Sequence, residues 1–157
     1  MAFEFSKERR AEAEEILKRY PVKRAALLPV LWLIHDEEGY ISDDAVKFAA
    51  EYLEMSPAEV WGVVTFYTMF QRRPVGRHHI QVCTNLCCRL KGADWLLDYL
   101  KGKLNAEVGK TTKDGKFHLS TVECLGSCGT APMMQIDNDY HENLDAEKVD
   151  KIISNLK

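Results

Sequence analysis

Five cysteines constrain the fold more strongly than any other feature of this 157-residue sequence. They form two groups that lie far apart along the chain: Cys83, Cys87 and Cys88 in "VCTNLCC", and Cys124 and Cys128 in "ECLGSCGTAP". In a reducing compartment, clustered cysteines favour a metal site or redox chemistry over structural disulfides. We therefore expect a fold that brings two distant loops together.

Composition predicts a globular protein of the cell interior. With 46% hydrophobic and 29% charged residues, the chain is long enough for one ordinary core or two small ones. A formal charge of -3 gives no reason to expect a nucleic-acid partner. The charged N-terminus lacks the apolar stretch of a secretory signal, and the longest apolar run is about half the length that a bilayer requires. We expect a cytoplasmic protein without membrane insertion.

Helix signals dominate the first part of the sequence. Ser6 and Ser42 are each expected to begin a helix, and a further apolar segment at 22–38 has helical character. The sequence Ser-Pro-Ala-Glu at 56–59 combines a capping box with proline at the first helical position, which predicts a fourth helix. Residues 1–75 are therefore predicted to form a helical bundle and a linker.

Strand signals dominate the rest of the sequence. "HHIQVC" at 78–83 alternates in polarity and predicts a strand, and the helix predicted after it should bury Trp95 and Tyr99. Two further pairs of strand-like segments flank the turn dipeptides Asp114-Gly115 and Asn138-Asp139, so each pair is expected to form a hairpin.

A last helix ends the sequence. Residues 76–157 are thus predicted to form an α/β layer resembling a thioredoxin-like domain, which makes the chain as a whole α+β.

Both cysteine groups follow predicted strands of this second domain. If those strand ends share one edge of the sheet, the first cysteine loop (83–88) and the second cysteine loop (124–128) can meet. Four thiolates could then converge, because Cys83 with Cys88 reads C-x4-C and Cys124 with Cys128 reads C-x3-C. Soft sulfur ligands suit zinc or an iron–sulfur cluster.

The spacing of the cysteines favours a cluster. Zinc sites with four cysteines usually use C-x2-C knuckles, and a thioredoxin-type dithiol requires C-x-x-C. Gly126 and Gly129 bracket Cys128, where they can turn backbone N–H groups toward cluster sulfurs or serve as ordinary turn residues. The alternatives are a zinc-stabilised interaction module, a set of inert buried thiols and a free-standing ferredoxin-like carrier that meets several partners transiently.

Three stretches that occur in order carry a resemblance to a known family: "WGVVTFYTMF" (61–70), "VCTNLCC" (82–88) and "ECLGSCGTAPMMQI" (123–136). Over nearly the whole chain, the sequence resembles the 24 kDa subunit family of NADH:quinone oxidoreductase, respiratory complex I, whose bacterial members are the E subunits. The resemblance implies a helical bundle followed by a thioredoxin-like domain with one [2Fe-2S] cluster. It also implies a larger partner subunit that holds FMN and binds NADH.

The resemblance assigns roles to individual residues. Carried over by motif, the cluster ligands that it implies are Cys83, Cys88, Cys124 and Cys128. The implied activity is the exchange of single electrons with the partner's FMN, in the peripheral arm of a membrane-bound complex. The chain itself is expected to have no NADH or FMN site, and its sequence contains no G-x-G-x-x-G motif. NAD-linked hydrogenases and formate dehydrogenases use the same family, so the parent complex stays open.

The sequence departs from the family pattern at Cys87. The family usually has small residues between its first two ligands, whereas this chain has Asn85, Leu86 and Cys87 there. We predict that Cys87 is not a ligand, because adjacent residues of an extended segment point their side chains apart. The aromatic-rich stretch 61–70 is expected either to close the helical bundle or to form a partner surface.

Overall fold

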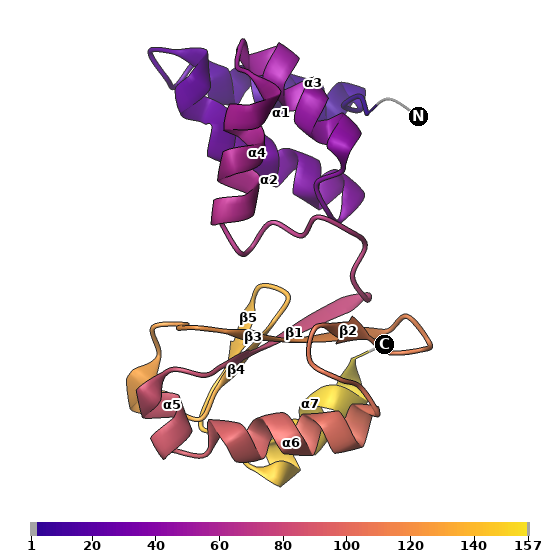
Figure 1. Cartoon of the computed structure of the whole chain (residues 1–157), viewed down its shortest axis with the longest axis vertical. Coiled ribbons are helices and arrows are strands. Elements are labelled where there is room, and N and C mark those ends of the chain that lie inside the picture. The colour runs from indigo at the N-terminus through magenta and orange to yellow at the C-terminus, as the bar shows by residue number, and fades with distance from the viewer. Residues whose placement is uncertain (1–2, 157) are drawn as a thin grey trace. The chain divides into compact units, whose positions relative to one another are not determined.

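The chain consists of two compact units. The computed structural model describes residues 3–156, and the units are Met1–Pro74 and Val75–Lys157 (Figure 1). Among the described residues, the first unit contains helices alone, whereas the second combines helices with a sheet. The predicted α+β class is confirmed. Within residues 3–156, no helix has both the length and the apolar character needed to cross a membrane.

Local capping signals set the helix starts of the first unit. The Ser6 side chain accepts a hydrogen bond from the Arg9 amide, at 3.3 Å, and Ser42 caps its helix in the same way. The predicted capping box between Ser56 and Glu59 is present. The helices are α1 (Lys7–Leu17), the 3-10 helix η1 (Lys23–Ala26), α2 (Leu27–Glu38), α3 (Asp43–Leu53) and α4 (Pro57–Phe66).

An apolar core holds these helices together. Leu31, Ile34 and Leu53 are fully buried in it, and burial of each such side chain contributes about 1.5–3 kcal/mol. Only some residues of the stretch 61–70 belong to this core. Its Phe70 is buried in the core, whereas Phe66 is 75% exposed. The stretch therefore closes the bundle and also leaves a large apolar group at the surface.

The described part of the second unit contains a five-stranded sheet with the order β2-β3-β1-β4-β5. The strands are β1 (His78–Cys83), β2 (Lys110–Thr111), β3 (Phe117–Val122), β4 (Met134–Ile136) and β5 (Asp139–His141). Strands β1 and β3 pair in parallel, whereas the other neighbours are antiparallel. Both predicted hairpins are present, as β2–β3 and β4–β5.

Helices of the second unit cover one face of the sheet. Figure 1 shows α6 (Ala93–Leu104) and α7 (Ala146–Asn155) on the same side of it. Leu96 and Leu100 of α6 are fully buried in the core there. The prediction that Trp95 is buried is wrong: Trp95 is 43% exposed and stacks on the half-buried Tyr99, with ring centroids 5.4 Å apart. Trp95 and Tyr99 each precede one of the buried leucines, and consecutive residues of a helix are offset by about 100°. The two aromatic residues therefore form a stripe beside that of Leu96 and Leu100.

Candidate metal centre

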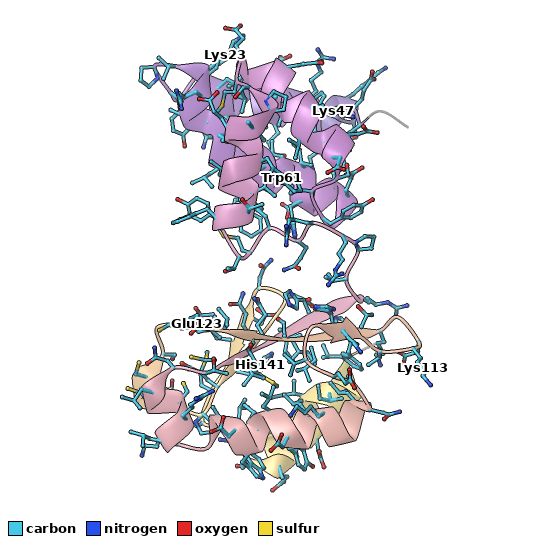
Figure 2. All side chains as sticks on the ribbon, in the orientation of Figure 1. Lys23, Lys47, Trp61, Lys113, Glu123 and His141 are labelled. Carbon is cyan, nitrogen blue, oxygen red and sulfur yellow. The ribbon has the colours of Figure 1, made fainter. Side chains whose placement is uncertain are left out.

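The two cysteine loops leave the sheet at the same edge. Because β1 and β3 run in parallel, their carboxyl ends lie side by side, and Cys83 at the end of β1 is in register with Val122 at the end of β3. Cys124 follows two residues after Val122. Figure 2 labels Glu123, the residue between them, at this end of the sheet. The strand ends thus share one edge, as the sequence predicts.

The first cysteine loop places two thiols in the protein interior. After β1, the chain turns into the short helix α5 (Leu86–Leu90), which the sequence analysis did not predict. Cys83 and Cys88 are only 2% and 1% exposed, and both pack in one apolar cluster with the fully buried Ala93 and Met133. The Cys83 amide donates to the Met133 carbonyl, at 3.4 Å. Backbone contacts and apolar packing therefore fix this pair.

The second cysteine loop lies at the surface. Cys124 and Cys128 are exposed, and the 3-10 helix η2 (Cys128–Thr130) closes the loop. Gly126 has a φ of 75°, a conformation that favours glycine, and its N–H donates to the Cys124 Sγ at 3.3 Å. No described atom lies within 4 Å of the position that a Cβ would take at Gly129. Gly126 alone of the two thus needs to be glycine for its backbone conformation.

The thiols lie within electrostatic reach of one another. Burial, the neighbouring thiol of Cys83 and the two thiols of the second cysteine loop raise the pKa of Cys88 to about 12. Contact with the Cys87 thiol raises the pKa of Cys128. Without a metal, Cys88 and Cys128 are therefore neutral at pH 7. Because a metal binds thiolates, loading this site must release protons.

Cys87 lies at the rim of the same site. The prediction about it assumed an extended segment, and this premise is wrong because Cys87 and Cys88 belong to α5. Adjacent side chains on a helix are still about 100° apart, so Cys88 points inward while Cys87 is exposed. In that position the Cys87 thiol is near enough to Cys128 to raise the pKa of the Cys128 thiol. All five cysteines of the sequence thus gather at one edge of the sheet.

The donor set fits a binuclear iron–sulfur cluster. Such a cluster is held by four thiolates, and the two loops together offer five thiols, among them the predicted ligands Cys83, Cys88, Cys124 and Cys128. Among residues 3–156, no three or more His, Cys, Asp or Glu side chains are grouped to hold a single metal ion. A binuclear cluster divides its ligands between two irons, so it does not require such a group.

Two further residues support the site, and sequence reasoning missed both. The Tyr140 hydroxyl donates to the Leu125 carbonyl at 2.9 Å. The Glu142 carboxylate accepts hydrogen bonds from the hydroxyls of Ser127 and Thr130. Glu142 is 15 residues from Ser127 in the sequence, so no local spacing could have identified these contacts.

The fold and the site together define a class of protein. Proteins of this class have an α/β domain in which two loops at the carboxyl ends of two parallel strands bring thiols together. Such a group of thiols offers a site for an iron–sulfur centre. Comparison with known proteins makes the class specific. The family described as thioredoxin-like [2Fe-2S] ferredoxin matches residues 13–157. The chain belongs to this family, whose name supports a [2Fe-2S] cluster over the zinc and inert-thiol alternatives.

Relatives match over nearly their whole length. The E subunit of NADH-quinone oxidoreductase from Rickettsia bellii (strain RML369-C) is 44% identical over 158 residues, which cover 99% of this chain and 95% of that protein. An E subunit of the same enzyme from Rhizobium meliloti (strain 1021) is 41% identical over 148 residues, which cover 94% of this chain and 88% of that protein. The predicted relationship to the E subunits is confirmed.

A solved structure shares the fold. The NAD+-reducing [NiFe]-hydrogenase in its air-oxidized state aligns with a TM-score of 0.72 at 23% sequence identity. The alignment covers 83% of this chain but only 22% of the hydrogenase chain. At this level of identity the likeness bears on the arrangement of helices and strands alone, whereas the thioredoxin-like fold is supported by the family match.

Proposed function

We propose that this chain is the electron-transfer subunit of an NADH:quinone oxidoreductase. In this role it exchanges single electrons between its own [2Fe-2S] cluster and the FMN of a larger, NADH-binding partner subunit. The observation that carries the proposal is the convergence of two buried and three exposed thiols at one sheet edge. Relatives that are 41–44% identical and are named as E subunits of this enzyme support the choice of complex.

The proposed ligands are Cys83, Cys88, Cys124 and Cys128. Chain proximity within each loop favours Cys83 and Cys88 on one iron and Cys124 and Cys128 on the other. When bound, a [2Fe-2S] cluster supplies one-electron redox chemistry. The chain is not expected to supply a nucleophile or a general base, nor to hold NADH or FMN itself, because hydride chemistry belongs to the flavin.

The residues around the thiols have two tasks in this role. Met133 and Ala93 exclude water from the inner side of the site, since both are fully buried against Cys83 and Cys88. The Gly126 amide stabilises negative charge on the Cys124 sulfur by donating to it at 3.3 Å, and hydrogen bonds to sulfur help to set a cluster's reduction potential. Both arrangements keep the ligands in place when the charge at the site changes.

Exposed apolar side chains support a protein partner at this site. Leu86 and Leu90 of α5 are 69% and 79% exposed, next to Cys87 in the first cysteine loop. Large apolar groups at the surface of a small domain are typical of interaction sites. We propose that they contact the FMN-containing subunit, within the peripheral arm of the complex. The exposed Phe66 of the first unit is a second candidate contact.

Anaerobic purification with metal analysis tests the proposal. We expect a reddish-brown protein with about two irons and two acid-labile sulfides per chain. Co-expression with an FMN-containing, NADH-binding subunit is expected to give co-elution in size-exclusion chromatography. A colourless protein carrying one zinc would refute the cluster, and a monomer beside a folded, flavin-loaded partner would refute the assembly.

A further inference from the structure

Residues of β5 and those after it form hydrogen bonds with the second cysteine loop and the residues that follow that loop. The Tyr140 hydroxyl donates to the Leu125 carbonyl, and the backbone N–H of Asn143 donates to the Thr130 carbonyl at 2.7 Å. The Leu144 amide donates to the Pro132 carbonyl at 3.1 Å. Residues 125–132 are thus bound at several points to residues 140–144, which we call the brace.

Glu142 makes the charged contact of this brace. Its Oε1 accepts a hydrogen bond from the Ser127 hydroxyl and another from the Thr130 hydroxyl, the latter at 2.6 Å. These two hydrogen bonds lower the pKa of the Glu142 carboxyl, so the group is a carboxylate at neutral pH. Ser127 immediately precedes Cys128. A fixed negative charge is therefore hydrogen-bonded to the residue that precedes a proposed ligand of the cluster.

The carboxylate shares the two hydroxyls with other acceptors: Ser127 Oγ and Thr130 Oγ1 lie 2.6 Å apart, and Thr130 Oγ1 is 3.2 Å from the Ser127 carbonyl oxygen. A hydroxyl has one hydrogen to donate, and hydrogen bonds to cluster or ligand sulfurs change the reduction potential. The negative charge of Glu142 opposes the uptake of an electron by a nearby cluster, so its removal would favour the reduced state.

We propose that Glu142 is a positioning residue that holds the second cysteine loop for cluster binding and lowers the reduction potential of the bound cluster. The loop-holding role follows from contacts within this chain alone. The effect on the potential rests on the proposed function, because it requires the [2Fe-2S] cluster. Tyr140 takes part in the loop-holding role without contributing a charge.

Hydrogen exchange of the metal-free, reduced protein tests the loop-holding role. Glu142→Ala removes both hydroxyl contacts, and Tyr140→Phe removes the contact to Leu125. In each variant we expect amides of residues 124–130 to exchange roughly tenfold faster than in the wild type, because loss of one such hydrogen bond changes an opening equilibrium by about that factor. Glu147→Gln is the control, because Glu147 is an exposed carboxylate that pairs with Lys151 of α7. Unchanged exchange in Glu142→Ala would overturn the role.

Redox titration of the cluster-loaded protein, followed by EPR, tests the effect on the potential. Glu142→Gln removes the charge but keeps an acceptor oxygen for the loop. At a fixed solution potential we expect the ratio of reduced to oxidised cluster to rise between about threefold and tenfold. A tenfold change corresponds to about 59 mV for a one-electron couple. Glu147→Gln and Tyr140→Phe are expected to change the ratio less.

The possible outcomes separate the two proposals. An equal shift in Glu142→Gln and Glu147→Gln, or no shift in either, would overturn the specific role of Glu142 in the potential. A wild-type protein that binds no [2Fe-2S] cluster would refute the proposed function and the potential effect with it. The hydrogen-exchange result would still decide whether Glu142 holds the loop.

Discussion

The two cysteine loops of this protein are built by different means. The first cysteine loop is fixed by a strand end, a short helix and apolar packing, so Cys83 and Cys88 are buried. The second cysteine loop has exposed cysteines, and the residues in and after it accept a hydrogen bond from Tyr140 and donate hydrogen bonds to Glu142. One pair of thiols thus belongs to the core of the domain, whereas the other belongs to its surface.

Because of this difference, we expect substitutions in the two loops to affect different properties of the protein. Changes around the buried pair should alter the free energy of unfolding, because they disturb close packing. Changes around the exposed pair should leave the fold intact and act on loop order and on the electrostatics of the site.

The largest expected effect is on stability, in Met133→Ala. Met133 is fully buried against Cys83 and Cys88, and truncating a buried methionine typically costs about 2–5 kcal/mol. Urea unfolding of the metal-free protein, followed by circular dichroism, measures the change. Met69→Ala is the matched control, because Met69 is 36% exposed. An equal loss of unfolding free energy in the two variants would show that close packing is no stronger around the first cysteine loop than at the exposed Met69.

Thiol reactivity should separate the two loops by an order of magnitude. In the reduced, metal-free protein at pH 8, we expect iodoacetamide to label Cys124 at least about tenfold faster than Cys83 or Cys88, because the buried thiols are inaccessible. Burial raises the pKa of Cys88 to about 12. Since the thiolate is the reactive form, its labelling rate should keep rising with pH toward that value. Peptide mass spectrometry measures the rates, and similar rates at pH 8 would contradict the comparison.

A smaller effect is expected from Gly126→Ala in the second cysteine loop. Gly126 has a φ of 75°, and a residue with a Cβ pays about 1–2 kcal/mol in the left-handed region. Gly129→Ala is the control, since its φ lies outside that region and no described atom crowds its Cβ position. Urea unfolding should show a loss of about 1 kcal/mol for Gly126→Ala and little change for Gly129→Ala. A Gly126→Ala variant as stable as the wild type would argue against the backbone constraint.

The sequence predicts best where the signal is local. The capping box of Ser56 and Glu59 lies within one helical turn. The alternating residues that end at Cys83 likewise predict β1, whose carboxyl end lies beside that of β3. The burial of Trp95 was mispredicted because neighbouring helix stripes differ by a single residue, and packing against the sheet selects between them. Glu142 was missed because its contact to the second cysteine loop exists only in three dimensions.

The environment of Cys87 was also mispredicted, for a related reason. The helix α5 is too short to give a periodic pattern, so the sequence predicts an extended segment there. As a result, nothing in the sequence indicates that the Cys87 thiol raises the pKa of Cys128. Whether Cys87 or Cys88 binds iron is therefore the point at which the ligand assignment is most open to test.

The smallest expected effect is that of Cys87→Ala. We expect this variant to keep about two irons per chain and a nearly unchanged EPR spectrum in the reduced state, because the buried Cys88 is the proposed ligand beside Cys83. Alanine is used because a serine oxygen could still bind iron.

The most direct test of the account compares iron content and EPR spectra of Cys87→Ala and Cys88→Ala after identical anaerobic purification. The account predicts that Cys88→Ala loses the cluster, or shows a changed spectrum with a substitute ligand, while Cys87→Ala matches the wild type. If Cys87→Ala loses the cluster and Cys88→Ala keeps it, the ligand pair is Cys83 with Cys87, and the buried thiol of Cys88 is not part of the centre.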